Sequence, residues 1–294
     1  EWFLGAFAFI FIFFFFLRDK GFNWRNLSQK SFTKKLFTWS FLFRLLALII
    51  ISLIAEIKTG KPFYVGSADA QFYYKFSIHA LDLLNTEGFE SAINFIIQPD
   101  RAPDDYGMLF FMMILHFFTF KSVYLTKILL CLLSSYTVVL GYKLGRLIWD
   151  ERTARLAGLF LMVFPLSLYY GVIYLKANLI AFLIINISYL VTKTFTHNIF
   201  NLKILISIIL QTGSLFFLRT ATGALMVILI FGAYFVNYYK GTRILSIAIG
   251  IIIIAVFILI LNSVGLTEVY YQRLTGAAES FGGNKLEYVK DINR

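Results

Sequence analysis

Long apolar runs constrain this chain more than any other feature. Eight stretches have the length and composition of membrane spans: residues 2–17, 37–57, 127–144, 156–171, 172–191, 202–218, 220–239 and 245–261. A transmembrane helix uses about 20 residues, so we predict an all-α, polytopic membrane protein with about eight transmembrane helices. Hydrophobic residues make up 59% of the chain and charged residues 15%, which excludes a soluble or disordered protein.

The distribution of basic residues predicts the topology. A ninth apolar run, residues 107–120, is shorter than a span needs, so we expect a short juxtamembrane helix that does not cross. The basic linkers 18–35, 143–155, 193–203 and 240–243 then share one side, which the positive-inside rule makes cytoplasmic. These linkers and their contacts with membrane lipids explain the net charge of +11 without nucleic acid as a partner.

The predicted topology divides the chain into three regions. Residues 1–36 hold the first span and a cytoplasmic basic linker, residues 37–262 the transmembrane core with its outward loop 58–121, and residues 263–294 an outward polar tail. The chain enters an apolar run at once, without a preceding basic stretch, which favours a trimmed chain with a real first span over a signal peptide. The tail stops in a polar stretch, so we expect the natural protein to extend further.

Asp69 is the first candidate for chemistry in the outward loop. It stands just ahead of a helical pattern that runs through Leu84. Two interpretations remain open: the carboxylate caps the helix, or it serves as a general base near the membrane surface, where partial desolvation and helix-end dipoles tune its pKa. Tyr74, in the same pattern, is a candidate substrate-binding residue.

Residues 98–106 contain two prolines, three acids and an arginine. A solvated turn explains this composition. In the functional interpretation, Arg101 binds an anionic group, and Asp104 or Asp105 binds sugar hydroxyls or a metal ion. Tyr106 is a further candidate substrate-binding residue in this segment. No cofactor is indicated with certainty, and a divalent metal is compatible with the two adjacent carboxylates.

Two cations, Lys176 and Arg219, lie at the predicted outer ends of spans. Each either extends to lipid headgroups or, with Arg101, holds a phosphate group of a lipid substrate. Arg44 and Lys127 lie nearer the edges of spans, and we expect them to extend to the headgroups. The histidines share no local pattern, so we expect packing roles for His79, His116 and His197.

Several weak motifs occur in a specific order between residues 37 and 239. An outward loop holds Asp69, followed by Tyr73 and Ala80; Pro103 precedes the short apolar helix; and Lys127 begins a later span. The remaining motifs are Tyr142-Lys143-Leu144-Gly145-Arg146 ending a span, Ala154 and Ala157 beginning the next, and Pro165 near its far end. This order resembles the GT-C superfamily of integral-membrane glycosyltransferases, in particular the bacterial relatives of protein O-mannosyltransferases and lipid A aminoarabinose transferases.

The resemblance implies transfer of a sugar from a polyprenyl-phosphate donor to a lipid, glycan or protein acceptor. It implies a bacterial inner-membrane location with the active site facing outward, and it gives Asp69 the role of general base. The sequence departs from the family pattern after Lys176, because Ala177 stands where many members carry an acidic residue.

The residues fit this chemistry without the family. One carboxylate suffices to deprotonate an acceptor hydroxyl, and the leaving phosphate needs cations rather than a general acid. No Gly-rich phosphate loop occurs, which favours a lipid-linked donor over a nucleotide sugar. Two alternatives remain: a polysaccharide polymerase or ligase, which would use arginines in a large late outward loop, and a transporter or flippase, which would carry charges in the middle of its spans.

Overall fold

The structure, a computed structural model, describes residues 24–60, 63, 68–98, 103–197 and 201–238. Every regular element in these ranges is helical, and they contain no strand. The predicted all-α class is therefore confirmed for this part of the chain. The chain divides into two compact units, Glu1–Arg219 and Thr220–Arg294, and the site described below lies entirely in the first.

Three helices are long and apolar enough to cross a membrane by themselves: α2 (Gln29–Thr59), α6 (Val123–Ile148) and α9 (Lys176–His197). A fourth candidate is the pair α7 (Glu151–Val163) and α8 (Pro165–Val172), which are bent by 55° relative to each other.

The described residues therefore support three to four spans, fewer than the eight predicted. The expected spans at residues 2–17 and 245–261 lie outside the described residues. Those at residues 202–218 and 220–239 correspond to α10 (Leu202–Leu218) and α11 (Thr220–Tyr238), which are shorter apolar helices.

Pro165 explains why the expected span at residues 156–171 is broken. A proline ring clashes with the preceding helical turn and lacks the N–H that would continue the hydrogen-bond ladder, but it fits the first position of a helix. Helix α7 therefore ends at Val163, and α8 begins at Pro165 in a new direction. The next span starts at Lys176 rather than at the predicted residue 172.

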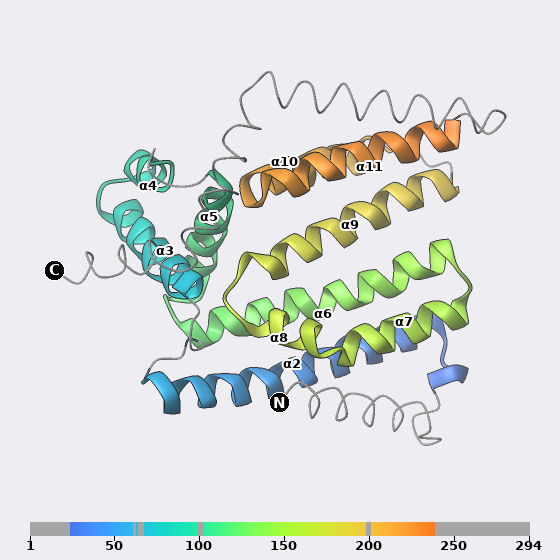
Figure 1. Ribbon diagram of the computed structural model, residues 1–294, viewed down its shortest axis with the longest axis horizontal. Helices are drawn as coiled ribbons and strands as arrows, with labels where there is room; N and C mark the ends of the chain where they lie inside the picture. The colour runs from blue at the N-terminus through green and yellow to red at the C-terminus, as the bar shows by residue number, and fades with distance from the viewer. Residues whose placement is uncertain (1–23, 61–62, 64–67, 99–102, 198–200, 239–294) are drawn as a thin grey trace, which may run out of the picture. The chain divides into compact units, whose positions relative to one another are not determined.

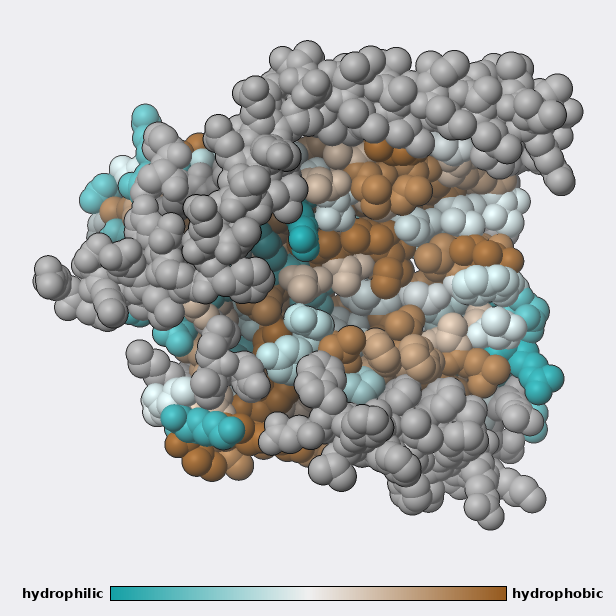
Figure 2. Space-filling view, viewed as in Figure 1, coloured by the Kyte–Doolittle hydropathy of each residue, from teal (hydrophilic) through white to brown (hydrophobic). Residues whose placement is uncertain are grey.

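Helix α2 buries polar as well as apolar side chains on one face and exposes apolar side chains on the other. Ser40, Arg44 and Ser52 are buried on one face. Such a helix would expose a large apolar surface in water, whereas in lipid it is the expected arrangement. Figure 2 shows hydrophobic side chains gathered along the described helices. The exposed large residues of α2 are Leu42, Leu46, Ile49, Ile50, Leu53, Ile54 and Ile57.

Three further helices, α3 (Ala68–Thr86), α4 (Phe89–Ile96) and α5 (Pro103–Phe118), pack against one another. They lie at one end of α2, α6 and α9, whereas the start of α2 and the turn from α6 to α7 lie at the opposite end (Figure 1). The helix expected at residues 107–120 is present as α5, but it begins at Pro103 and buries Met108 and Met112 against its neighbours; its position at the membrane surface stays a prediction.

Candidate functional site

A buried ion pair joins α5 to the start of α9. Lys176 Nζ lies 3.1 Å from Asp105 Oδ1, and it also donates to the Asp104 carbonyl oxygen at 3.4 Å. The Asp105 side chain is 8% exposed and that of Lys176 25%. Of the two interpretations of Lys176, extension to lipid headgroups alone does not fit, because its ammonium group is held by protein oxygens.

Tyr73 of α3 is the third member of this cluster. Its hydroxyl donates to Asp105 Oδ1 at 2.6 Å, and the residue is fully buried. Burial raises the pKa of the Tyr73 phenol, and the Asp105 carboxylate raises it further. Tyr73 consequently keeps its proton and acts as a hydrogen-bond donor, so Asp105 is bonded from both sides by a phenol and an ammonium group.

Asp69 lies on the same face of α3 as Tyr73, four residues earlier. Its carboxylate and that of Asp104 both add to the pKa increase at Tyr73, so both lie within electrostatic reach of the cluster. Helix α3 begins at Ala68, and Asp69 therefore sits inside its first turn. A carboxylate in this position interacts favourably with the helix dipole, and its side chain is partly exposed.

The position of Lys176 opposes helix stability. It is the first residue of α9, and a cation at a helix N-terminus meets the positive end of the helix dipole, an unfavourable interaction of about 0.3–1 kcal/mol. The Asp105 carboxylate offsets this repulsion. The lysine is thus better explained by what its ammonium group binds than by any gain for the helix.

Gly107 lies where α5 packs closely against α10. A Cβ atom at Gly107 would lie 2.9 Å from the Phe217 carbonyl oxygen, closer than real Cβ contacts, so glycine is needed where α5 meets α10. Arg219, which caps the end of α10, follows Phe217 by two residues. The Arg219 side chain is exposed and makes no hydrogen bond or ion pair with the part of the chain that the structure describes.

Other predicted site residues lie elsewhere or outside the described part. Arg101 falls in the range 99–102, which is not described. The Tyr106 hydroxyl donates to the Gln98 carbonyl oxygen at 3.1 Å, and the Tyr74 hydroxyl donates to the Lys121 carbonyl oxygen at 3.5 Å. These two bonds are to backbone oxygens and fix loop geometry.

Sequence reasoning missed a buried polar cluster around His116. His116 of α5 is fully buried, its Nε2 atom is hydrogen-bonded to the Tyr174 hydroxyl, and its Nδ1 atom lies 3.5 Å from Thr126 Oγ1. Burial lowers the His116 pKa to about 4, with a further contribution from Lys121. The ring is therefore neutral at pH 7. No local pattern could have revealed this group, because its members come from three distant segments.

The structure corrects the expectation for Arg44 and Lys127. Arg44 is 0% exposed and Lys127 4% exposed, so neither extends to the headgroups. Arg44 donates to Ser134 Oγ at 2.7 Å and to Ser167 Oγ at 2.8 Å, and Lys127 donates to Ser52 Oγ at 3.1 Å. The two cations are held inside the helix bundle, where a charge is costly unless it is well hydrogen-bonded.

The cluster does not fit a divalent metal. In the described ranges, no group of three or more His, Cys, Asp or Glu side chains is arranged to hold a metal ion. Asp105 Oδ1 already accepts from Tyr73 and Lys176, and the adjacent ammonium group repels a second cation. We therefore derive no chemical step through a metal.

Comparison with known proteins adds no relative, because no protein family, curated protein sequence or solved structure matches the chain. The class of protein rests on the structure alone. The described residues form an all-helical chain whose long apolar helices are compatible with an integral membrane protein. The cluster around Asp105 and Lys176 is its candidate site.

Proposed function

We propose that this protein is a membrane glycosyltransferase. It transfers a sugar from a polyprenyl-phosphate donor to an acceptor on the outer side of the membrane. The observation that carries the proposal is the meeting of α3, α5 and α9 in one cluster, at the end of the bundle away from the turn between α6 and α7. The resemblance of the sequence to GT-C enzymes supports it.

We assign the base to Asp69. In the transfer, the carboxylate takes the proton of the acceptor hydroxyl, and the acceptor oxygen forms a bond to the anomeric carbon of the sugar. The bond between that carbon and the phosphate oxygen breaks, and the phosphate leaves with the electron pair. Asp105 is less suited to take the proton, because its Oδ1 atom already accepts hydrogen bonds from Tyr73 and Lys176.

We assign the leaving phosphate to Lys176, Arg219 and Arg101. An ammonium group has three N–H donors, and those of Lys176 bond to Asp105 Oδ1 and to the Asp104 carbonyl oxygen, which leaves one for phosphate. The guanidinium of Arg219 is exposed and has the planar geometry that suits phosphate, and Arg219 follows by two residues the point where α10 contacts α5 at Gly107. Asp104, together with the tyrosines Tyr74 and Tyr106, would contact the sugar or the acceptor.

As part of this proposal, the chain crosses the membrane eight times and lies in the bacterial inner membrane. Four spans come from α2, α6, α9 and the bent pair of α7 and α8. Helix α10 has 17 residues and is about 26 Å long at 1.5 Å per residue, slightly less than the hydrocarbon thickness of about 30 Å. It would span with local thinning of the bilayer, a modest cost.

The direct test is transfer by the purified wild-type protein. Reconstituted protein is mixed with a radiolabelled polyprenyl-phosphate sugar and a membrane extract as the source of acceptor. Label should appear in an acceptor, with stoichiometric formation of polyprenyl phosphate. Absence of both products with hexose and pentose donors alike would overturn the proposal.

One observation favours a second function, a lipid-phosphate transporter or flippase. Arg44 is buried within the long apolar helix α2, and its side-chain hydrogen bonds go to serine oxygens. A buried cation of this kind marks a substrate pathway in many transporters. In proteoliposomes, a transporter would move the lipid without cleaving it, and Arg44→Gln would stop the movement while Lys203→Gln, an exposed site on α10, would not.

A further inference from the structure

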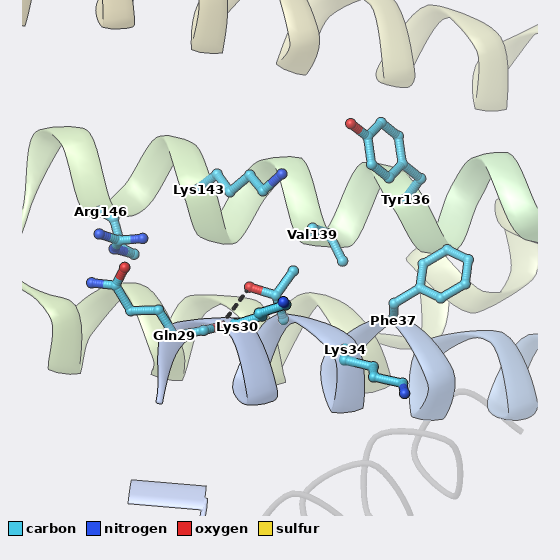
Figure 3. A pocket seen from close by; sticks show the side chains of 9 residues that line it. Gln29, Lys30, Lys34, Phe37, Tyr136, Val139, Lys143 and Arg146 are labelled. Atoms are coloured by element: carbon cyan, nitrogen blue, oxygen red, sulfur yellow. Dashed lines mark hydrogen bonds between the residues drawn. The ribbon is translucent and has the colours of Figure 1, made fainter. Parts of the chain in front are cut away.

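A groove opens between the start of α2 and the end of α6 (Figure 3). Its volume is about 510 Å³, within the range of about 300–1,000 Å³ that is typical of small-molecule sites. It lies at the end of α6 that leads into α7, whereas α3 and α5 of the Asp105 cluster lie at the opposite end (Figure 1).

The groove is strongly cationic at the ends of the helices. Lys30 and Lys34 line it from α2, and Lys143 and Arg146 line it from α6, with no acidic residue in the lining. The three lysines form no ion pair with any residue that the structure describes. A concave surface of this composition attracts anions.

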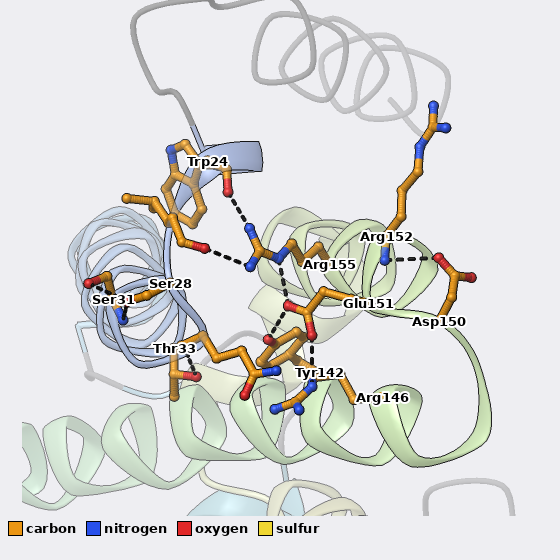
Figure 4. Close-up of polar contacts among 12 residues, drawn as sticks. Trp24, Ser28, Ser31, Thr33, Tyr142, Arg146, Asp150, Glu151, Arg152 and Arg155 are labelled. Carbon is orange, nitrogen blue, oxygen red and sulfur yellow. Dashed lines mark hydrogen bonds and ion pairs between the residues drawn. The ribbon is translucent and has the colours of Figure 1, made fainter.

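A neighbouring acid neutralises part of this charge and fixes the arginine. Glu151 Oε2 lies 2.8 Å from Arg146 Nε, and Glu151 Oε1 accepts from Arg155 Nε at 2.6 Å (Figure 4). Arg155 also donates to the carbonyl oxygens of Trp24 and Leu27, at 2.7 Å each. One carboxylate thus pairs with two arginines and with none of the three lysines of the groove.

The lining changes from cationic to apolar along both helices. On α2, Lys30 and Lys34 are followed by Phe37 one turn deeper in the span. On α6, Lys143 is preceded by Val139 one turn deeper. Charges at the helix ends with apolar residues beneath them match the two parts of a phospholipid, an anionic headgroup and a hydrocarbon chain.

We propose that this groove binds the phosphate group of an anionic membrane lipid, with a lipid chain lying along Phe37 and Val139. The lysines from the two helices contact the phosphate, so that the lipid bridges α2 and α6. This inference does not depend on the proposed transferase activity, because it uses residues at the opposite end of α6.

The test is lipid binding by the full chain in nanodiscs of phosphatidylcholine with a labelled phosphatidylglycerol probe. The variant Lys30→Ala/Lys143→Ala removes one charge from each side of the groove. Each basic residue near an anionic lipid contributes about 1 kcal/mol, so the affinity should fall by about ten- to thirtyfold. The matched control Lys58→Ala/Lys203→Ala removes two exposed lysines outside the lining and should change the affinity less than about threefold.

Three further measurements complete the test. The variant Lys30→Arg/Lys143→Arg should retain the affinity, which separates loss of charge from damage to the fold. Competition by millimolar inorganic phosphate would identify free phosphate as the ligand, whereas its failure to compete identifies the lipid. Equal affinity of wild type and Lys30→Ala/Lys143→Ala, or an equal loss in the matched control, would overturn the proposal.

Discussion

Lys176 Nζ lies 3.1 Å from Asp105 Oδ1, although 71 positions separate the two residues. The Asp105 side chain is 8% exposed and that of Lys176 25% exposed, so the two members of the pair differ in their access to water. This difference determines which member is the more costly to remove.

Lys176→Met should destabilise the protein more than Asp105→Asn does. The first variant leaves a buried carboxylate without its cation, a loss of about 3–5 kcal/mol for fully buried pairs and about 1–3 kcal/mol here because the lysine is partly exposed. In the second variant, the ammonium group still reaches water. Melting temperatures in detergent measure the difference.

The ion pair between Lys121 and Asp82 provides a control. Its side chains are 41% and 48% exposed, and exposed pairs contribute only about 0–1 kcal/mol. Lys121→Met should therefore leave the melting temperature almost unchanged. The predicted difference in stability between the two variants is disproved if Lys176→Met and Asp105→Asn melt at the same temperature.

Gly171→Ala should destabilise the helix bundle around Arg44. A Cβ atom at Gly171 would overlap Ser134 Oγ and lie 3.0 Å from Arg44 Nε, so it would push apart a hydrogen bond of 2.7 Å between those side chains. The expected loss is about 1–3 kcal/mol, as for other overpacked cores.

Gly213→Ala in α10 is the matched control, because nothing lies within 4 Å of a Cβ atom there. Alanine is a better helix former than glycine by about 1 kcal/mol, so this variant should be neutral or more stable. If Gly171→Ala and Gly213→Ala have the same melting temperature, overlap of the new Cβ atom with Ser134 and Arg44 does not explain the effect of Gly171→Ala.

The sequence predicted the helical class, which the described residues confirm, but it did not predict how the candidate site residues are held. Asp105 and Lys176 were both candidates, yet their pairing depends on packing between α5 and α9, which no local pattern encodes. For Arg44, the hydrophobic run suggested contact with headgroups, and only the serines of α2, α6 and α8 explain its burial. The break at Pro165 could have been predicted, because the proline itself is its signal.

The free energy of unfolding should decrease as the pH is lowered below about 6.5, because His116 is buried in its neutral form. Its pKa is lowered from an ordinary 6.5 to about 4 in the folded protein, so the unfolded state binds more protons between these values, and folding becomes less favourable as the pH falls. The contribution at pH 5 is about 2 kcal/mol. His116→Gln should reduce this pH dependence.

Thermal melting at pH 7 and pH 5 in the same detergent measures this effect. His79, an exposed histidine of α3, provides the control variant His79→Gln, which should retain the wild-type dependence. If the wild type and His116→Gln lose the same amount of thermal stability between pH 7 and pH 5, groups other than His116 cause the loss.

Cysteine labelling should place α3 and the start of α2 on opposite sides of the membrane. Asn85→Cys and Ser31→Cys are both exposed positions, and Cys131, the only native cysteine, is buried. An impermeant maleimide added outside should label Asn85→Cys at once, and Ser31→Cys only after permeabilisation. Labelling of both from outside would contradict the predicted topology.

The central claim is that Asp69 is the base of a sugar transfer, and Asp69→Asn tests it most directly. Asparagine keeps the size of the side chain but cannot accept a proton at neutral pH. Asp82→Asn, on the same helix, is the matched control and should retain the wild-type rate. The measurement is the rate of sugar transfer from a polyprenyl-phosphate donor by purified protein. We expect Asp69→Asn to bind the donor normally while transfer falls by about 10²–10⁴-fold; a transfer rate equal to that of the wild type would contradict the account.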